Sequence, residues 1–274
     1  MKASLILCLI QFDILWENPS ANRLKLETYF QEIENSTDVI ILPEMFTTGF
    51  SMNPKPITET MDGTTLNWML DWSKKLDAAI CGSLVITENG NHYNRFVFVT
   101  PQGKVDSYDK RHRFMMAGEG EHYTAGESRV LIEYLGWKIL PQICYDLRFP
   151  VYARNTVDYD VLLFVANWPK TRIAAWDALL TARAIENMAY CIGVNRVGLD
   201  GNGHNYVGHS AVYDVLGADC TTSKGHLDKD KMSNDKPDFK VEEGIIPVTL
   251  SKSLITTTRS KLPFLEDRDS FTLN

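Results

Sequence analysis

The chain has 274 residues, enough for a large hydrophobic core, and its 44% hydrophobic and 23% charged residues are typical of a globular protein. A net charge of −7 argues against nucleic acid or an anionic membrane as the main partner, because both require a basic surface. The five cysteines (8, 81, 144, 191 and 220) are scattered and odd in number, which argues against a disulfide framework or a zinc site and predicts a reducing, cytoplasmic setting.

Strand and helix signals alternate along the chain. The first apolar stretch, residues 5–10, is too short for a signal peptide or a membrane span, so we expect a buried strand there. Apolar, β-branched runs predict strands over residues 3–11, 39–42, 79–87, 95–100, 130–134, 139–144, 161–166, 189–195, 210–213 and 244–250. Helical spacing predicts helices over residues 21–34, 65–76, 172–187 and 251–258. This alternation predicts an α/β protein with two packed sheets, which we expect to form one domain over residues 1–274; the polar segment 222–240 predicts an exposed hairpin or loop.

Cys144 follows directly on one of these apolar runs, residues 137–143. A thiol at that junction lies at the end of a buried strand and faces solvent, with backbone N–H groups beside it. A nucleophile needs this placement. The alternative is a buried structural cysteine, because free cysteine is among the most buried residue types.

Two further polar residues end apolar runs in the same way. Glu44 follows the run 39–43, where a carboxylate is costly unless it is paired or hydrogen-bonded; the alternative is a helix-initiating acid or a salt-bridge partner. Lys110 follows a hairpin marked by Gly103, and the alternative is an exposed basic cluster. All three residues fall at the C-terminal ends of predicted strands, where open α/β sheets place their ligand crevices.

These three side chains make chemical sense together. A nearby ammonium lowers the pKa of a thiol, and a carboxylate in a confined pocket can take the thiol proton and return it to a leaving amine. Lys110 and the backbone N–H of Tyr145 can stabilise the oxyanion of a tetrahedral intermediate. The histidines at 112, 204 and 209 have no evident orienting acid, and the six histidines of the chain are too dispersed to predict a metal site.

The motifs around these residues resemble those of the nitrilase superfamily of carbon–nitrogen hydrolases. Leu42-Pro43-Glu44-Met45-Phe46 is similar to its glutamate motif, Tyr108-Asp109-Lys110-Arg111-His112 to its lysine motif, and the segment 143–150 to its cysteine motif. The segments 46–52, 116–119, 167–169, 182–187, 195–203 and 262–265 look like those of the bacterial ω-amidase branch.

The resemblance implies a four-layer αββα sandwich that dimerises through its helices and uses no cofactor. It implies hydrolysis of the terminal amide of 2-oxoglutaramate or 2-oxosuccinamate to the 2-oxo acid and ammonia, through a thioester on Cys144. It also implies a fourth acid in the catalytic site, for which Glu119 is the best match and Glu121 the alternative.

Residues that bind the substrate are less clearly marked. A substrate carboxylate requires a cationic or N–H-rich pocket, and Arg113, Arg172 and Arg148 are candidates by position. For Arg148 we favour a structural pair, with Asp146 or with a neighbouring strand end. Trp168 and Phe46 follow strand ends and are candidates for apolar walls, although Phe46 fits the core equally well. We expect Arg183 and Glu186 to pair on one helix and the turn 200–203 to reach a pocket rim.

Three alternatives remain open. The first is another hydrolase on the same scaffold: an aliphatic amidase, a carbamoylase or a nitrilase. The second is a non-catalytic binding protein, against which the intact trio argues, since burying such an ionic group is costly. The third, a glutaminase domain feeding a synthetase, requires a nucleotide-binding domain for which the chain leaves no room.

Overall fold

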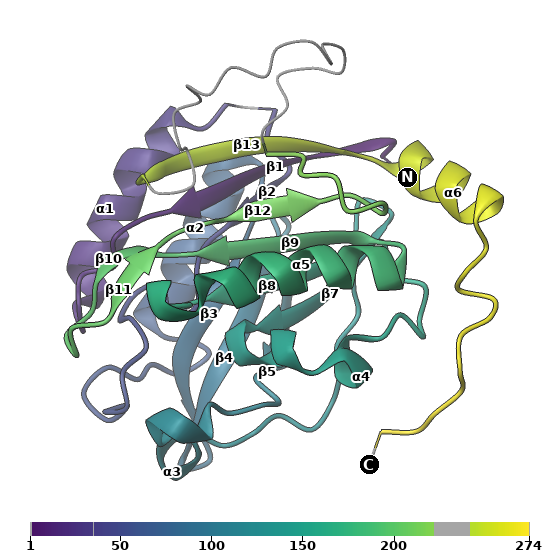
Figure 1. Ribbon diagram of the computed structural model, residues 1–274. Helices are drawn as coiled ribbons and strands as arrows, with labels where there is room; N and C mark the ends of the chain where they lie inside the picture. The colour runs from purple at the N-terminus through teal and green to yellow at the C-terminus, as the bar shows by residue number, and fades with distance from the viewer. Residues whose placement is uncertain (1, 35, 222–241, 274) are drawn as a thin grey trace, which may run out of the picture.

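Two β-sheets pack face to face, and helices cover both outer faces (Figure 1). The computed structural model describes residues 2–34, 36–221 and 242–273. This arrangement is the expected four-layer αββα sandwich. The loop predicted over residues 222–240 lies outside the described residues.

The first sheet has six strands in the order β13-β1-β2-β3-β4-β5. Its strands are β1 (Ser4–Gln11), β2 (Val39–Ile41), β3 (Ala79–Glu88), β4 (Asn91–Val99), β5 (Val105–Asp109) and β13 (Gly244–Ser251). β1, β2 and β3 are parallel, whereas β3, β4 and β5 form an antiparallel meander. β2 and β5 therefore run in the same direction, and their C-terminal ends lie on the same edge of the sheet.

The second sheet has five strands in the order β12-β9-β8-β7-β6. They are β6 (Ile132–Tyr134), β7 (Trp137–Ile143), β8 (Val161–Ala166), β9 (Tyr190–Asn195) and β12 (Ala211–Tyr213). β7, β8 and β9 are parallel and buried on both faces, which explains their continuous apolar sequences. A separate hairpin joins β10 (Val197–Leu199) and β11 (Asn205–Val207).

Four helices, three long and one short, cover the outer faces. α1 (Pro19–Glu32) and α2 (Thr64–Leu76) lie against the first sheet, and α4 (Pro150–Ala153) and α5 (Ile173–Asn187) against the second. Two more helices, α3 (Glu119–His122) and α6 (Lys252–Lys261), complete the described set. α1 begins where Asn18 accepts a hydrogen bond from the N–H of Ala21, with a proline in its first turn.

Three apolar clusters hold the layers together. The central cluster lies between the two sheets and joins Leu7 and Phe96 of the first sheet to Ile143 and Leu163 of the second. The outer clusters pack α1 and α2 on one side and α5 on the other. In α5 the predicted stripe is confirmed: Trp176, Leu180 and Ala184 are fully buried, whereas Ile173 is only partly buried.

Most differences from the predicted elements concern short or boundary segments. The strand predicted over 139–144 ends at Ile143, because Cys144 begins a 3₁₀-helix that continues to Arg148. β10 and β11 were not expected, because three residues carry too little of an alternating pattern to be recognised. Among the described residues, no helix has the length and apolar character needed to cross a membrane.

Candidate active site

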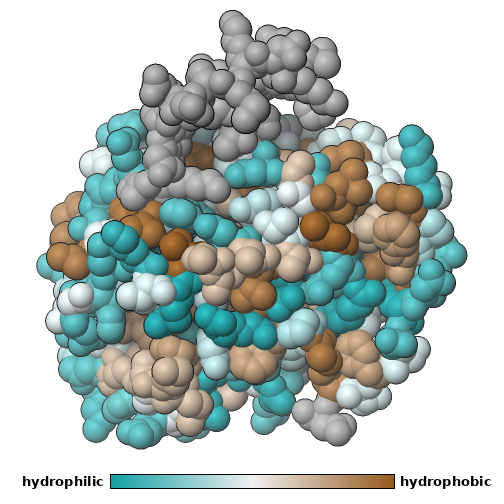
Figure 2. Space-filling view, in the orientation of Figure 1, coloured by the Kyte–Doolittle hydropathy of each residue, from teal (hydrophilic) through white to brown (hydrophobic). Residues whose placement is uncertain are grey.

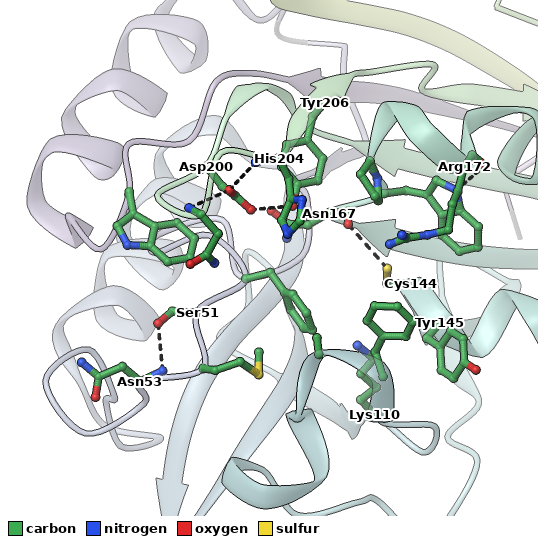
Figure 3. Close-up of a pocket in the computed structure, with 18 of the residues that line it drawn as sticks. Ser51, Asn53, Lys110, Cys144, Tyr145, Asn167, Arg172, Asp200, His204 and Tyr206 are labelled. Atoms are coloured by element: carbon green, nitrogen blue, oxygen red, sulfur yellow. Dashed lines mark hydrogen bonds between the residues drawn. The ribbon is translucent and has the colours of Figure 1, made fainter.

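The three strand ends that carry Glu44, Lys110 and Cys144 meet in the structure. Glu44 lies just beyond β2 and Lys110 directly follows β5, both in the first sheet, whereas Cys144 directly follows β7 in the second. Lys110 and Cys144 line the same cavity, and Figure 3 shows both facing it. Glu44 is fully buried behind Lys110. The sheet-to-sheet packing therefore brings together residues that lie far apart in the sequence.

Lys110 lies between two carboxylates. Its Nζ is 3.0 Å from Oε1 of Glu44 and 3.0 Å from each carboxylate oxygen of Glu119. Burial lowers the pKa of Lys110, but the negative charges of Glu119 and Glu44 more than offset this, so the net shift is upward. The ring of Phe50 lies 4.9 Å from Nζ on another side. Lys110 is therefore a fixed cation next to the thiol.

Two asparagines hold the carboxylate of Glu44. Nδ2 of Asn94 donates to Oε1 at 2.7 Å, and the backbone N–H of Asn167 donates to Oε2 at 2.8 Å. Nδ2 of Asn167 also donates to the backbone carbonyl of Glu44 at 2.6 Å. Neither asparagine was expected to have a role in the site. A signal existed for Asn167, since it directly follows the apolar strand β8, but Asn94 lies within β4 and carries no such signal.

The structure distinguishes the two candidate acids of the short helix α3. Glu119 is fully buried and bonded to Lys110, whereas Glu121 is exposed. Burial raises the pKa of Glu119, Lys110 opposes this shift, and Glu44 adds to it, with a net upward shift. Arg113 supports this segment, because its guanidinium donates to the carbonyls of Gly120 and Tyr123. It is not among the residues that line the cavity of Cys144.

Cys144 has an unusual backbone conformation and a shifted thiol pKa. Its φ of 45° lies in the left-handed region, which a residue other than glycine adopts at a cost of about 1–3 kcal/mol and which is common at active sites. Burial raises the thiol pKa, Glu44 raises it further, and Lys110 lowers it only in part. The expected lowering by the Lys110 ammonium is therefore present, but burial and Glu44 outweigh it, so the net shift of the thiol pKa is upward.

Asp146 supports the turn that carries Cys144. Its carboxylate accepts hydrogen bonds from the hydroxyl of Tyr108 at 2.7 Å and from the backbone N–H groups of His112 and Ile143 at 2.9 and 3.0 Å. It also lies 2.7 Å from Nδ1 of His112. His112 thus has the orienting acid that the sequence analysis did not find. However, its ring stacks on Phe149 and lines a different cavity from that of Cys144.

The expected pair between Arg148 and Asp146 does not form. The carboxylate of Asp146 is hydrogen-bonded to Tyr108, His112 and the N–H of Ile143. Instead the guanidinium of Arg148 lies 4.9 Å from the ring of Trp168, and Arg148 lines the cavity of Cys144. The expected pair of Arg183 and Glu186 is present, at 2.9 Å.

The cavity has a volume of about 580 Å³ and both apolar and charged walls. Tyr145, Trp168 and Arg172 line it, as expected, and the guanidinium of Arg172 lies 5.1 Å from the ring of Phe114. Phe46 does not line it and packs in the outer core near Trp68. The turn after β10 reaches the cavity, as expected, through Asp200 and Asn202, and the following His204 also lines it. Figure 3 shows Asp200 and His204 there.

Among the described residues no group of three or more His, Cys, Asp or Glu side chains has the spacing to hold a metal ion. All five cysteines are free thiols. The cavity is lined by a thiol and a fixed cation, and the buried carboxylate of Glu44 lies directly behind the cation. These three groups can carry out nucleophilic attack on a carbonyl carbon.

Comparison with known proteins agrees with this geometry. The sequence pattern of the carbon-nitrogen hydrolase family matches residues 7–222. The omega-amidase YafV of Escherichia coli (strain K12) is 43% identical over 267 residues, which cover 97% of each chain. The 2-oxoglutaramate amidase of Bacillus subtilis is 33% identical over 213 residues, covering 76% of this chain and 82% of that protein. XC1258 of Xanthomonas campestris, a CN-hydrolase superfamily protein with an arsenic adduct in its active site, is 39% identical, with a TM-score of 0.91 and full coverage of both chains. The chain described here belongs to the carbon–nitrogen hydrolase family.

Proposed function

We propose that the protein is an ω-amidase that hydrolyses the terminal amide of a small 2-oxo dicarboxylic acid monoamide, such as 2-oxoglutaramate or 2-oxosuccinamate, to the 2-oxo acid and ammonia. The observation that carries this proposal is the meeting of Glu44, Lys110 and Cys144 at a cavity that two arginines also line. The names of the relatives, omega-amidase and 2-oxoglutaramate amidase, support the choice of substrate.

In the acylation half-reaction, Glu44 takes the proton of the neutral Cys144 thiol while Sγ forms a bond to the amide carbon. The negative charge that develops on the carbonyl oxygen is held by the Lys110 ammonium and the backbone N–H of Tyr145. Lys110 has a proton available for this role: one N–H serves Glu44, and a second is shared between the two oxygens of Glu119. The carbon–nitrogen bond then breaks, Glu44 returns the proton to the leaving nitrogen, and ammonia departs from a thioester.

In the deacylation half-reaction, Glu44 takes a proton from a water molecule as its oxygen attacks the thioester carbon. The carbon–sulfur bond breaks, the proton returns to Sγ, and the 2-oxo acid leaves. Glu119 does not touch the reacting atoms in this scheme. It acts by holding the Lys110 ammonium in place.

The substrate carboxylate has two candidate partners in Arg148 and Arg172. The guanidinium of Arg148 lies over the ring of Trp168, and that of Arg172 lies over the ring of Phe114. Neither arginine forms an ion pair with a carboxylate among the described residues, and both line the cavity. A planar guanidinium held in this way is well suited to a bidentate carboxylate contact. Arg148, which the sequence analysis favoured as structural, therefore joins Arg172 as a proposed substrate-binding residue.

Ammonia release from a panel of amides tests the proposal. We expect turnover of 2-oxoglutaramate and 2-oxosuccinamate, little or none of glutamine or a simple nitrile, and no turnover by Cys144→Ala. Arg172→Met should raise KM at least about tenfold for the 2-oxo acid amides, because charged hydrogen bonds contribute about 1.5–3 kcal/mol. Activity on glutamine or a nitrile alone would reject the ω-amidase assignment, and undiminished turnover by Cys144→Ser would reject the thioester.

We further propose that the enzyme acts in the cytoplasm as a homodimer joined through its helices. Val151 of α4 and Ile185 of α5 are exposed apolar residues, and the face that presents α5 carries apolar patches between hydrophilic ones (Figure 2). Such patches are typical of contact surfaces between proteins.

A further inference from the structure

Behind Glu44 lies a second set of polar side chains that the proposed mechanism does not use. Ser83 of β3 and Asn94 of β4 are buried, on neighbouring antiparallel strands. The loop that carries Glu44 is fastened to Ser83 by hydrogen bonds from the two residues that follow the glutamate. The N–H of Met45 donates to Oγ of Ser83 at 2.8 Å, and the N–H of Phe46 donates to its carbonyl at 3.2 Å.

These contacts fix which way the Asn94 amide points. Because Oγ of Ser83 accepts from Met45, its own proton is available to Asn94, and it donates to Oδ1 at 2.8 Å. With Oδ1 committed to Ser83, Nδ2 is directed at Glu44 and donates to Oε1 at 2.7 Å. The backbone carbonyl of Asn94 also accepts from the N–H of Lys110 at 3.0 Å. Asn94 thus contacts both the carboxylate and the backbone of the lysine.

The two carboxylate oxygens of Glu44 differ in their remaining capacity to accept hydrogen bonds. Oε1 receives two close donors, Nδ2 of Asn94 at 2.7 Å and Nζ of Lys110 at 3.0 Å. Oε2 receives one close donor, the N–H of Asn167 at 2.8 Å, and a longer one at 3.4 Å from its side chain. A carboxylate oxygen has two lone pairs, so Oε2 keeps more capacity to accept a further proton. This difference favours Oε2 as the oxygen that takes the thiol proton.

We propose that Asn94, oriented by Ser83, is a positioning residue that ties Oε1 of Glu44 and leaves Oε2 directed at the thiol. This inference depends on the proposed role of Glu44 as the base. Among the described residues, the ionisable groups that interact with that carboxylate are Lys110, Glu119, Cys144 and Tyr123. Asn94 and Asn167 are its neutral donors. A donor to the ionised form favours the charged carboxylate, and Asn94 supplies one without adding a charge.

Steady-state kinetics of Asn94→Ala and the isosteric Asn94→Asp test this role. We expect kcat to fall about ten- to hundredfold, because a misplaced catalytic group costs up to about that much, while KM changes less than about twofold. The acidic limb of the kcat/KM profile should move to higher pH, because the ionised base has lost a donor. Asn155 offers a matched control: it is a buried amide with several hydrogen bonds that holds a loop near α5, away from the cavity. Asn155→Ala should lower the melting temperature and leave the pH profile unchanged.

Ser83→Ala provides a second test if Asn94→Ala does not fold. It removes the proton that orients the amide, so kcat should fall in the same direction. In the double variant Ser83→Ala/Asn94→Ala, kcat should be little lower than in Asn94→Ala alone, because both substitutions disrupt the same contact to Glu44. The positioning role alone would be overturned if Asn94→Asp and Ser83→Ala kept the wild-type kcat and an unshifted pH profile of kcat/KM while Glu44→Gln was inactive. An active Glu44→Gln would overturn the proposed base itself.

Discussion

At the scale of single residues, the site is defined by charges that few proteins bury. Lys110 and the carboxylates of Glu44 and Glu119 have almost no exposure to solvent. Burying one such charge alone would cost several kcal/mol, but here each carboxylate lies 3.0 Å from the same ammonium. Burial of these three charges is therefore stable only when all three are present together.

Glu119 and Glu121, the two acidic residues of α3, allow a matched test of the contact between Lys110 and Glu119. We expect Glu119→Gln to reduce kcat about ten- to hundredfold, because Lys110 loses a charged partner worth about 1.5–3 kcal/mol. Glu121→Gln, two residues away and exposed, should stay within about twofold of wild type. Ammonia release under saturating substrate measures both. Equal effects of the two changes would contradict the assignment of Glu119.

The raised thiol pKa of Cys144 predicts slow alkylation. Because the thiolate is the reactive species, the rate with iodoacetamide should be low at pH 7 and still rise with pH beyond pH 9. Lys110→Ala should slow it further, since the ammonium is the group that lowers this pKa. Peptide mass mapping separates Cys144 from the other partly exposed cysteine, Cys220. A rate that is already maximal at pH 7 would contradict a neutral resting thiol.

At the scale of elements, the strand ends explain why the site forms where it does. β2, β5, β7 and β8 each stop within three residues of a site residue. A strand buried on both faces has no place for a polar side chain, so such residues gather where the strand ends. This rule made Glu44, Lys110 and Cys144 predictable. It did not lead to Asn94, which lies inside β4 and is satisfied by Ser83 and Glu44.

The contact between α5 and β9 offers a test of packing at this scale. A Cβ on Gly193 would lie 2.5 Å from Leu180 and 2.6 Å from Trp176, so Gly193→Ala should destabilise the protein by about 1–3 kcal/mol. Leu180→Ala alone should cost about 2–5 kcal/mol, but the double variant should cost less than the sum, because the smaller side chain makes room. Urea unfolding of the three variants measures these energies. Strictly additive losses in the free energy of unfolding would contradict a direct contact between Gly193 and Leu180.

At the scale of the whole molecule, the site depends on two sheets that meet through one core. Glu44 and Lys110 belong to the first sheet and Cys144 and Asn167 to the second, and the central cluster sets the distance between them. The dimer and the assignment of all 274 residues to one domain stay predictions.

The shared core predicts that activity and fold are lost together. Leu163→Ala, in the central cluster, should lower stability by about 2–5 kcal/mol. Activity and far-ultraviolet circular dichroism should then decline at the same denaturant concentration, because the sheets cannot separate without exposing that cluster. Loss of activity well before the change in circular dichroism would indicate that the sheets open independently.

The amino-acid sequence by itself determined most of the strands, the longer helices and the three residues that carry the chemistry. These follow from local patterns: apolar runs, helical spacing and the polar residue at a strand end. Only the tertiary structure decided between Glu119 and Glu121, turned Arg148 from Asp146 toward the cavity, placed Phe46 in the core, and put Asn94 and Asn167 on the two oxygens of Glu44. The physical reason is that burial, charge pairing and hydrogen-bond partners are properties of neighbours in space. Those neighbours come from two different sheets, and no spacing along the chain specifies how the sheets face each other.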